Sequence, residues 1–195
     1  MDPSAPSSWS WLWRHVVGAA TLVILGWRTF GSDSPLLPLT LIELAFHESS
    51  HWATIWAPRV IYFLAGSVGQ ILIPLLIAAH LWVRMRDPLG GALGIGWAGL
   101  SAHGVAVYVA DAPYERLQLV GGNTHDWAYL LGPEQFDAID AAGRLATAIN
   151  GMGIAMVVAG VLVCLASPVV TFQRASRNPD APLGSVHWQA ERADG

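Results

Sequence analysis

Charged residues are scarce in this chain of 195 residues, and their scarcity excludes most soluble folds. Only 12% of the residues are charged and 53% are hydrophobic, against roughly 25% charged in typical soluble proteins. The mean hydropathy is +0.44. A water-soluble globule of this composition would expose far more apolar surface than is usual, and a disordered chain would be much less apolar. The composition therefore predicts an integral membrane protein.

Cysteine and excess basic charge are lacking as well. The single cysteine, Cys164, lies within an apolar run, so a disulfide framework and a thiolate metal site are both excluded. The formal net charge of −4 argues against a nucleic-acid partner, because no basic stripe is available to neutralise phosphates. Any metal ion must be held by histidines and carboxylates.

Long apolar runs predict the architecture. Four runs reach the roughly 20 residues that cross a bilayer as a helix; they are residues 36–56, 60–83, 89–109 and 145–170. A shorter run at 16–27 spans only if it is extended back over 11–15. We interpret it as a retained span and not as a signal peptide, because no positive charge precedes Arg14. The sequence thus predicts an all-α polytopic membrane protein with about five transmembrane helices.

Polar segments flank and interrupt this transmembrane domain. Residues 1–14 are expected to form a short polar N-terminal segment, 15–170 the transmembrane helical domain, and 171–195 a polar, disordered C-terminal tail. Within the acidic connection 111–142, Pro133 followed by Glu134 predicts an amphipathic helix that leads into the last span.

Ionisable residues inside the run 36–56 indicate a metal site. Residues 47–51 read His-Glu-Ser-Ser-His, an HExxH sequence, and on a helix its two imidazoles share one face and can bind one metal ion. Glu48 can reach a metal-bound water and act as its general base. Because such groups are costly at membrane depth, we interpret His47, Glu48 and His51 as functional. Glu43, one turn earlier, is expected either to fix the tautomer of His47 or to bond to another helix.

The third metal ligand must come from elsewhere in the chain, since zinc hydrolases hold the ion with three protein ligands and a water. His125 and Asp126, in a segment that follows two glycines, are the candidates, with His125 slightly favoured. The other of the two is expected to orient a ligand or to bind the metal as well. His103, in the middle of the run 89–109, is a weaker candidate, either as a ligand, as a hydrogen-bond donor to substrate, or as a packed histidine.

The motifs resemble those of the site-2-type intramembrane zinc metalloproteases. The HExxH helix is followed by a small-residue motif at 65–70, Ala-Gly-Ser-Val-Gly-Gln. The resemblance implies that His47 and His51 bind Zn²⁺ and that Glu48 is catalytic. It also implies that Gly66 and Gln70 hold substrate backbone near the metal, with Gln70 at the place where the family commonly has asparagine.

The same resemblance implies a third ligand near the start of a later membrane helix. In the family this ligand is an aspartate within a Leu-Asp-Gly-like motif, which is absent here. Either Asp126 matches the family aspartate or His125 replaces it.

The leading hypothesis is an intramembrane zinc metalloprotease that hydrolyses peptide bonds in or beside the membrane through a metal-activated water. Its substrate is expected to be a transmembrane protein or peptide that is partly unwound at the site, because a helix hides its carbonyls in its own hydrogen bonds. Two alternatives keep the metal: a membrane zinc hydrolase of a lipid or small amide, and a non-enzymatic metal-binding membrane protein. The expected location is the lipid bilayer of a bacterial inner (plasma) membrane.

Overall fold

The computed structural model describes residues 8–32, 34–120 and 124–177, and within these ranges it contains helices but no strands. The α-helices are α1 (Ser8–Gly26), α2 (Leu37–Ala53), α3 (Arg59–Ala79), α4 (Pro88–Asp111), α5 (Asp126–Leu131) and α6 (Ala142–Arg177). Short π- or 3₁₀-helical turns follow α1 and α3 and precede α6; they are η1 (Trp27–Gly31), η2 (His80–Arg84) and η3 (Ile139–Ala141). The predicted all-α fold is confirmed.

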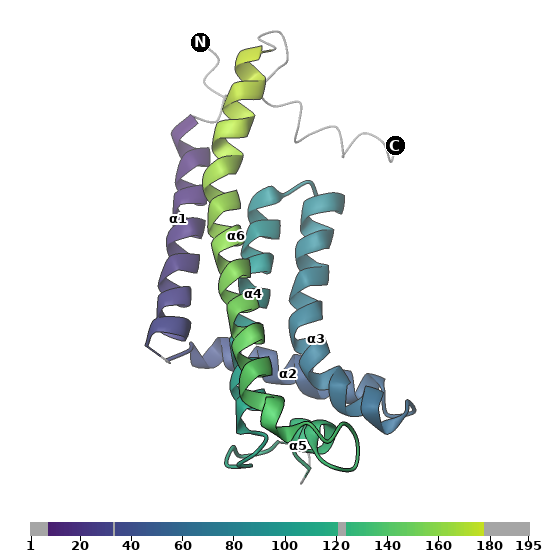
Figure 1. Ribbon diagram of the computed structural model, residues 1–195. Helices are drawn as coiled ribbons and strands as arrows, with labels where there is room; N and C mark the ends of the chain where they lie inside the picture. The colour runs from purple at the N-terminus through teal and green to yellow at the C-terminus, as the bar shows by residue number, and fades with distance from the viewer. Residues whose placement is uncertain (1–7, 33, 121–123, 178–195) are drawn as a thin grey trace.

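Four helices, α1, α3, α4 and α6, stand side by side, and α2 crosses their lower ends (Figure 1). α4 packs against both α6 and α3, whereas α1 packs mainly against α6. α2 and α5 lie at the same end of the bundle, and both pack against α3. The segments that carry the predicted site residues therefore meet at one end of the bundle.

Three helices of the described part of the chain are long and apolar enough to cross a membrane; they are Arg59–Arg84, Pro88–Asp111 and Ile139–Pro168. They indicate membrane association, but the prediction of about five transmembrane helices is not confirmed. α2, formed from the run 36–56, has 17 residues, about 25 Å at the usual helical rise, which is less than the roughly 30 Å of a hydrocarbon core. It also lies across the bundle instead of along it, and α1 is not among the three helices either.

The distribution of apolar and polar residues around α2 explains why its sequence predicts a transmembrane helix. Glu43, His47 and His51 follow one another at four-residue spacing and are all buried, whereas Leu41 and Trp52 on the outside are 57% and 79% exposed. A helix on a water-soluble protein has the opposite arrangement. The apolar residues that make the run 36–56 hydrophobic thus belong to the exposed face of α2.

The helix predicted to start at Pro133 is wrong. Gly132, which precedes the proline and is restricted to extended backbone, ends α5. The chain then turns, and the N–H groups of Asp137 and Ala138 donate to the carbonyls of Gly132 and Leu131 at 2.9 and 2.8 Å. The last helix, α6, continues to Arg177, past position 171, where the tail was predicted to begin; residues 178–195 of that tail lie outside the described residues.

The helices α4 and α6 approach each other closely at a pair of glycines. A Cβ atom added to Gly99 would lie 2.5 Å from the carbonyl oxygen of Gly153, and one added to Gly153 would lie 2.6 Å from the carbonyl oxygen of Gly99. Small residues permit this backbone contact between membrane helices. The α4–α6 pair is the scaffold against which α3, and through it α2 and α5, are held.

Replacing Gly99 by alanine tests this contact. We expect Gly99→Ala to lower the free energy of unfolding by about 1–3 kcal/mol, because the helices must separate to admit the methyl group. The measurement is unfolding of the purified protein in detergent. Gly151→Ala on α6 is the control: no atom lies within 4 Å of its added Cβ, and alanine favours the helix. Equal stabilities of the two variants would contradict the proposed contact.

Candidate metal centre

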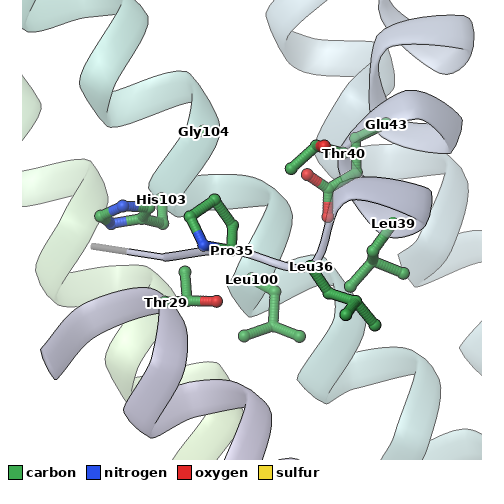
Figure 2. Close-up of a pocket in the computed structure, with 9 residues that line it drawn as sticks. All are labelled: Thr29, Pro35, Leu36, Leu39, Thr40, Glu43, Leu100, His103 and Gly104. Atoms are coloured by element: carbon green, nitrogen blue, oxygen red, sulfur yellow. The ribbon is translucent and has the colours of Figure 1, made fainter. Parts of the chain in front are cut away.

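The inner face of α2 begins at Glu43, which lines a small pocket with His103 (Figure 2). The pocket has a volume of about 30 Å³ and lies between the start of α2 and α4. Burial raises the pKa of Glu43 to about 7, against the opposing effects of Ser101, Trp97 and His103 on α4. The side chains that act on Glu43 thus belong to α4, while the Nδ1 of His47 lies beside Gln70 and not beside Glu43.

His103 is held within the bundle and not at the candidate metal centre. Its Nδ1 lies 2.9 Å from Oδ1 of Asn150 on α6, and its ring packs edge-on against Phe30. Among the described residues, it does not belong to the group of side chains that could share a metal ion. Its predicted contact with a substrate stays a prediction.

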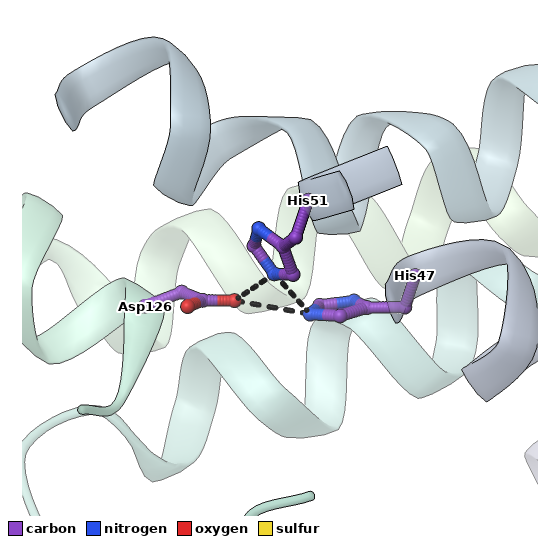
Figure 3. Close-up of side chains that lie close together, drawn as sticks. All are labelled: His47, His51 and Asp126. Carbon is purple, nitrogen blue, oxygen red and sulfur yellow. Dashed lines mark hydrogen bonds and ion pairs between the residues drawn. The ribbon is translucent and has the colours of Figure 1, made fainter. Parts of the chain in front are cut away.

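His47 and His51 follow Glu43 on the same face of α2 and meet Asp126, the first residue of α5 (Figure 3). The Nε2 atoms of the two histidines lie 3.0 and 3.1 Å from Asp126 Oδ2 and 3.1 Å from each other. In a tetrahedral zinc site with bonds of 2.0–2.1 Å, ligand atoms are about 3.3 Å apart. A small expansion of this triangle thus gives three of the four positions of such a site.

Both histidines are oriented through their other ring nitrogen. His51 Nδ1 lies 2.8 Å from the carbonyl oxygen of Tyr62, which can only accept, so this nitrogen carries a proton. His47 Nδ1 lies 3.2 Å from Gln70 Oε1, and the amide of Gln70 is turned this way because its Nε2 donates to the carbonyl of Ser101 at 3.4 Å. In the neutral rings the two Nε2 atoms therefore present lone pairs to Asp126, as metal-binding histidines do.

The electrostatic interactions among His47, His51 and Asp126 favour an ionised carboxylate beside protonated imidazole. Burial on its own would raise the pKa of Asp126, but hydrogen bonds and charges from His47 and His51 outweigh it and hold that pKa below its ordinary value. Burial would lower the pKa of His51, but the hydrogen bond and charge of Asp126 and the carbonyl of Tyr62 raise it. The triangle thus favours positive charge on its histidines and negative charge on Asp126.

Gly66 leaves the space in which a metal ion would sit. A Cβ atom added to Gly66 would lie 2.5 Å from Nε2 of His47 and 2.5 Å from Nε2 of His51, closer than van der Waals contact permits. Gly66 and Gln70, which the sequence predicts to contact a substrate, thus lie directly against the two histidines, and Gln70 is bonded to one of them.

Glu48 lies beside the triangle but outside it. Its side chain is half-buried, and its negative charge is close enough to favour the protonated form of His51. Its carboxylate makes no hydrogen bond to another described residue, so it is available to accept a proton near the two histidines.

Asp126, and not His125, joins the two histidines. His125 is 1% exposed; its Nδ1 accepts a hydrogen bond from the N–H of Ala128 at 3.2 Å and so caps α5. Its Nε2 faces Asp111 Oδ2 at 3.5 Å. Burial lowers the pKa of His125 despite the nearby carboxylates of Asp111 and Asp126. Its Nδ1 is thus bonded within α5, and its Nε2 faces Asp111 and not the candidate metal centre.

α5 is fixed to the bundle by two further contacts that the sequence did not indicate. The N–H of Asp126 donates to Tyr108 Oη at 3.1 Å, and Trp127 Nε1 donates to Ser67 Oγ at 2.9 Å. These contacts bring α5 onto α4 and α3. The Ser67 contact lies inside the small-residue motif, but a serine there gives no signal of its partner.

No family model, curated protein or solved structure matches this chain. The geometry of the buried His47–His51–Asp126 group is therefore the main structural basis for a function, and it identifies a possible metal site without identifying the metal.

Substitution of Gly66 tests the space between the histidines. We expect Gly66→Ala to weaken metal binding by at least about 100-fold, more than the change of an outer-shell partner typically costs, because the methyl group occupies the position between the two Nε2 atoms. The measurement is zinc content and zinc affinity of the purified protein. Gly151→Ala, with open space around its added Cβ, is the control. Full zinc affinity in a folded Gly66→Ala variant would contradict the site.

Proposed function

We propose that this protein is a membrane zinc metallopeptidase that hydrolyses peptide bonds in or beside the bilayer. The observation that carries the proposal is the convergence of three donor atoms, His47 Nε2, His51 Nε2 and Asp126 Oδ2, within 3.0 to 3.1 Å of one another. Two imidazoles and one carboxylate leave one position of a tetrahedral zinc site open for water, which is the pattern of catalytic sites.

The chemistry of the donors favours zinc or another transition-metal ion over magnesium and calcium. Imidazole nitrogens suit zinc, copper, iron and nickel, whereas magnesium and calcium prefer sites made of oxygen alone. A zinc ion held here would lower the pKa of a bound water and polarise a substrate carbonyl. The three residues that hold it are buried, so the site has the low-dielectric surroundings in which such polarisation is strong.

Glu48 is assigned the role of general base. It follows His47 directly on α2, its charge acts on His51, and its carboxylate is free of hydrogen bonds to the other described residues. It would take the proton of the attacking water and then pass it to the leaving amine. Gln70 is assigned to the orientation of His47 in place of the predicted substrate contact, since its amide is already bonded on both sides.

The position of the site supports action close to the membrane. Gly66 lies about 10 Å along α3 from Arg59, at 1.5 Å per residue, so the site is set back from the end of a helix that can span a bilayer. The outer face of α2 exposes Leu41 and Trp52. An apolar outer face and a buried polar inner face suit a helix that separates lipid from a catalytic centre.

Removal of each ligand tests the metal site. We expect His47→Ala, His51→Ala and Asp126→Ala each to lose bound zinc, because two ligands alone hold the ion weakly. The measurement is metal analysis of the purified protein after dialysis against a defined free zinc concentration. His80→Ala is the matched control, since His80 is an exposed histidine on η2. Unchanged zinc content in the three ligand variants would contradict the site.

Glu48→Gln tests the reaction. We expect this variant to keep its zinc and to lose about 10²- to 10⁴-fold in rate, the usual contribution of a general base. Membrane vesicles that contain either wild-type protein or the variant are incubated, and new peptide termini are identified by mass spectrometry. This readout requires no known substrate.

The outcomes separate the competing functions. Equal sets of new termini with both proteins, each loaded with zinc, would exclude Glu48 as the base. Release of fatty acid or of a small amine by the wild-type protein, without new peptide termini, would instead favour a lipid or small-amide hydrolase.

A further inference from the structure

The loop between α4 and α5 is tied at both ends to one carboxylate, that of Asp111, the last residue of α4. Near the start of the loop, Asp111 Oδ2 accepts hydrogen bonds from the N–H groups of Arg116 at 3.0 Å and Leu117 at 2.9 Å. Near its end, the same oxygen faces His125 Nε2 at 3.5 Å. The residue that follows His125 is Asp126, the only ligand of the candidate metal centre that α2 does not supply.

The ring of His125 has a defined orientation and tautomer. Its Nδ1 accepts the N–H of Ala128 and so carries no proton, which leaves the ring proton on Nε2, the atom that faces Asp111. The ring also packs on that of Tyr108, with 4.2 Å between centroids. Nε2 is buried and makes no ordinary hydrogen bond, so the negative charge of Asp111 is the interaction that the described residues offer it.

Two residues of α4 thus hold the start of α5 together. Tyr108 and Asp111 are three residues apart and share one face of the helix. Tyr108 Oη accepts the N–H of Asp126, and Asp111 attracts the ring that precedes it. Asp111 thus acts on the residue directly before the ligand Asp126.

We propose that Asp111 and His125 form a positioning pair that holds Asp126 at the metal. The inference rests on the proposed metal site and adds to it two residues that touch neither the ion nor the reacting atoms. Without the pair, Asp126 is a ligand at the end of a long loop, while the other two ligands are fixed on one helix. The pair makes the third ligand as well placed as the first two.

Asparagine substitutions distinguish a role in positioning Asp126 from a role only in holding the loop through the N–H groups of Arg116 and Leu117. Asp111→Asn keeps one side-chain oxygen for the N–H groups of Arg116 and Leu117 but loses the charge that attracts His125. His125→Asn keeps the cap of α5, because asparagine is a favoured N-cap residue, but loses the ring. Asp87→Asn is the matched control, since Asp87 also accepts a backbone N–H, that of Gly90 at 3.0 Å, at the other end of α4.

The full-length protein in detergent, stripped of metal, is titrated with Zn²⁺ and separately with Co²⁺. We expect Asp111→Asn and His125→Asn each to weaken zinc binding about tenfold or more, in the range of outer-shell changes. The visible spectrum of the Co²⁺ form should shift with them, because the geometry around the ion changes. The double variant should bind zinc with about the affinity of whichever single variant binds it less tightly, because both changes break the same interaction. Asp87→Asn should match the wild type.

Three results would overturn the proposal. If Asp111→Asn keeps the zinc affinity and the Co²⁺ spectrum of the wild type, the pair does not position Asp126 and only contacts the loop. Fully additive losses in the double variant would show that the two residues act separately. If the wild-type protein itself does not bind zinc, both the proposed function and this inference are wrong. If the wild type binds zinc and the variants bind it equally well, only this inference is wrong.

Discussion

In the neutral tautomers that Gln70 and the carbonyl of Tyr62 favour, two imidazole nitrogens and one carboxylate oxygen meet in the interior of this protein with their lone pairs toward one another. The protons of His47 and His51 are directed outwards, to Gln70 and to the carbonyl of Tyr62. Such a meeting of acceptors is unfavourable in a low-dielectric interior unless a positive charge lies at its centre. A proton can supply that charge and so can a metal ion, and the rest of the site is arranged around this requirement.

One face of α3 lies against the candidate metal centre. Tyr62, Gly66 and Gln70 are four residues apart and therefore lie along one side of the helix. Tyr62 and Gln70 orient the two histidines through backbone and side-chain oxygens, and Gly66 between them leaves room. A single helical face thus provides both orientation and space, and α2 only has to dock against it.

The parts of the fold and the site that were predictable from sequence are those governed by local periodicity. Apolar runs located α3, α4 and α6, and the HExxH spacing placed His47 and His51 on one face of a helix. Hydropathy could not show that the apolar residues of α2 face outward on a transverse helix, because an average over a run does not record direction.

The choice of the third ligand depended on contacts distant in sequence. His125 and Asp126 are neighbours that can both bind a metal ion, and what separates them is the capping of α5 and the contacts with Tyr108 and Asp111, which lie 14 to 18 residues away on another helix. The contact of Gln70 with His47 is likewise a tertiary contact that the sequence did not indicate, while its predicted contact with a substrate stays a prediction.

The three candidate ligands also link two parts of the chain that are 75 and 79 residues apart in sequence. An ion bound between them acts as a reversible cross-link that closes a long loop, and closing a long loop removes much conformational freedom from the unfolded chain. Metal uptake and the docking of α2 and α5 are then two aspects of one equilibrium, while the glycine contact between α4 and α6 is independent of the ion. With an ion bound there, the molecule would combine a part held by its paired helices with a part whose order is coupled to metal binding.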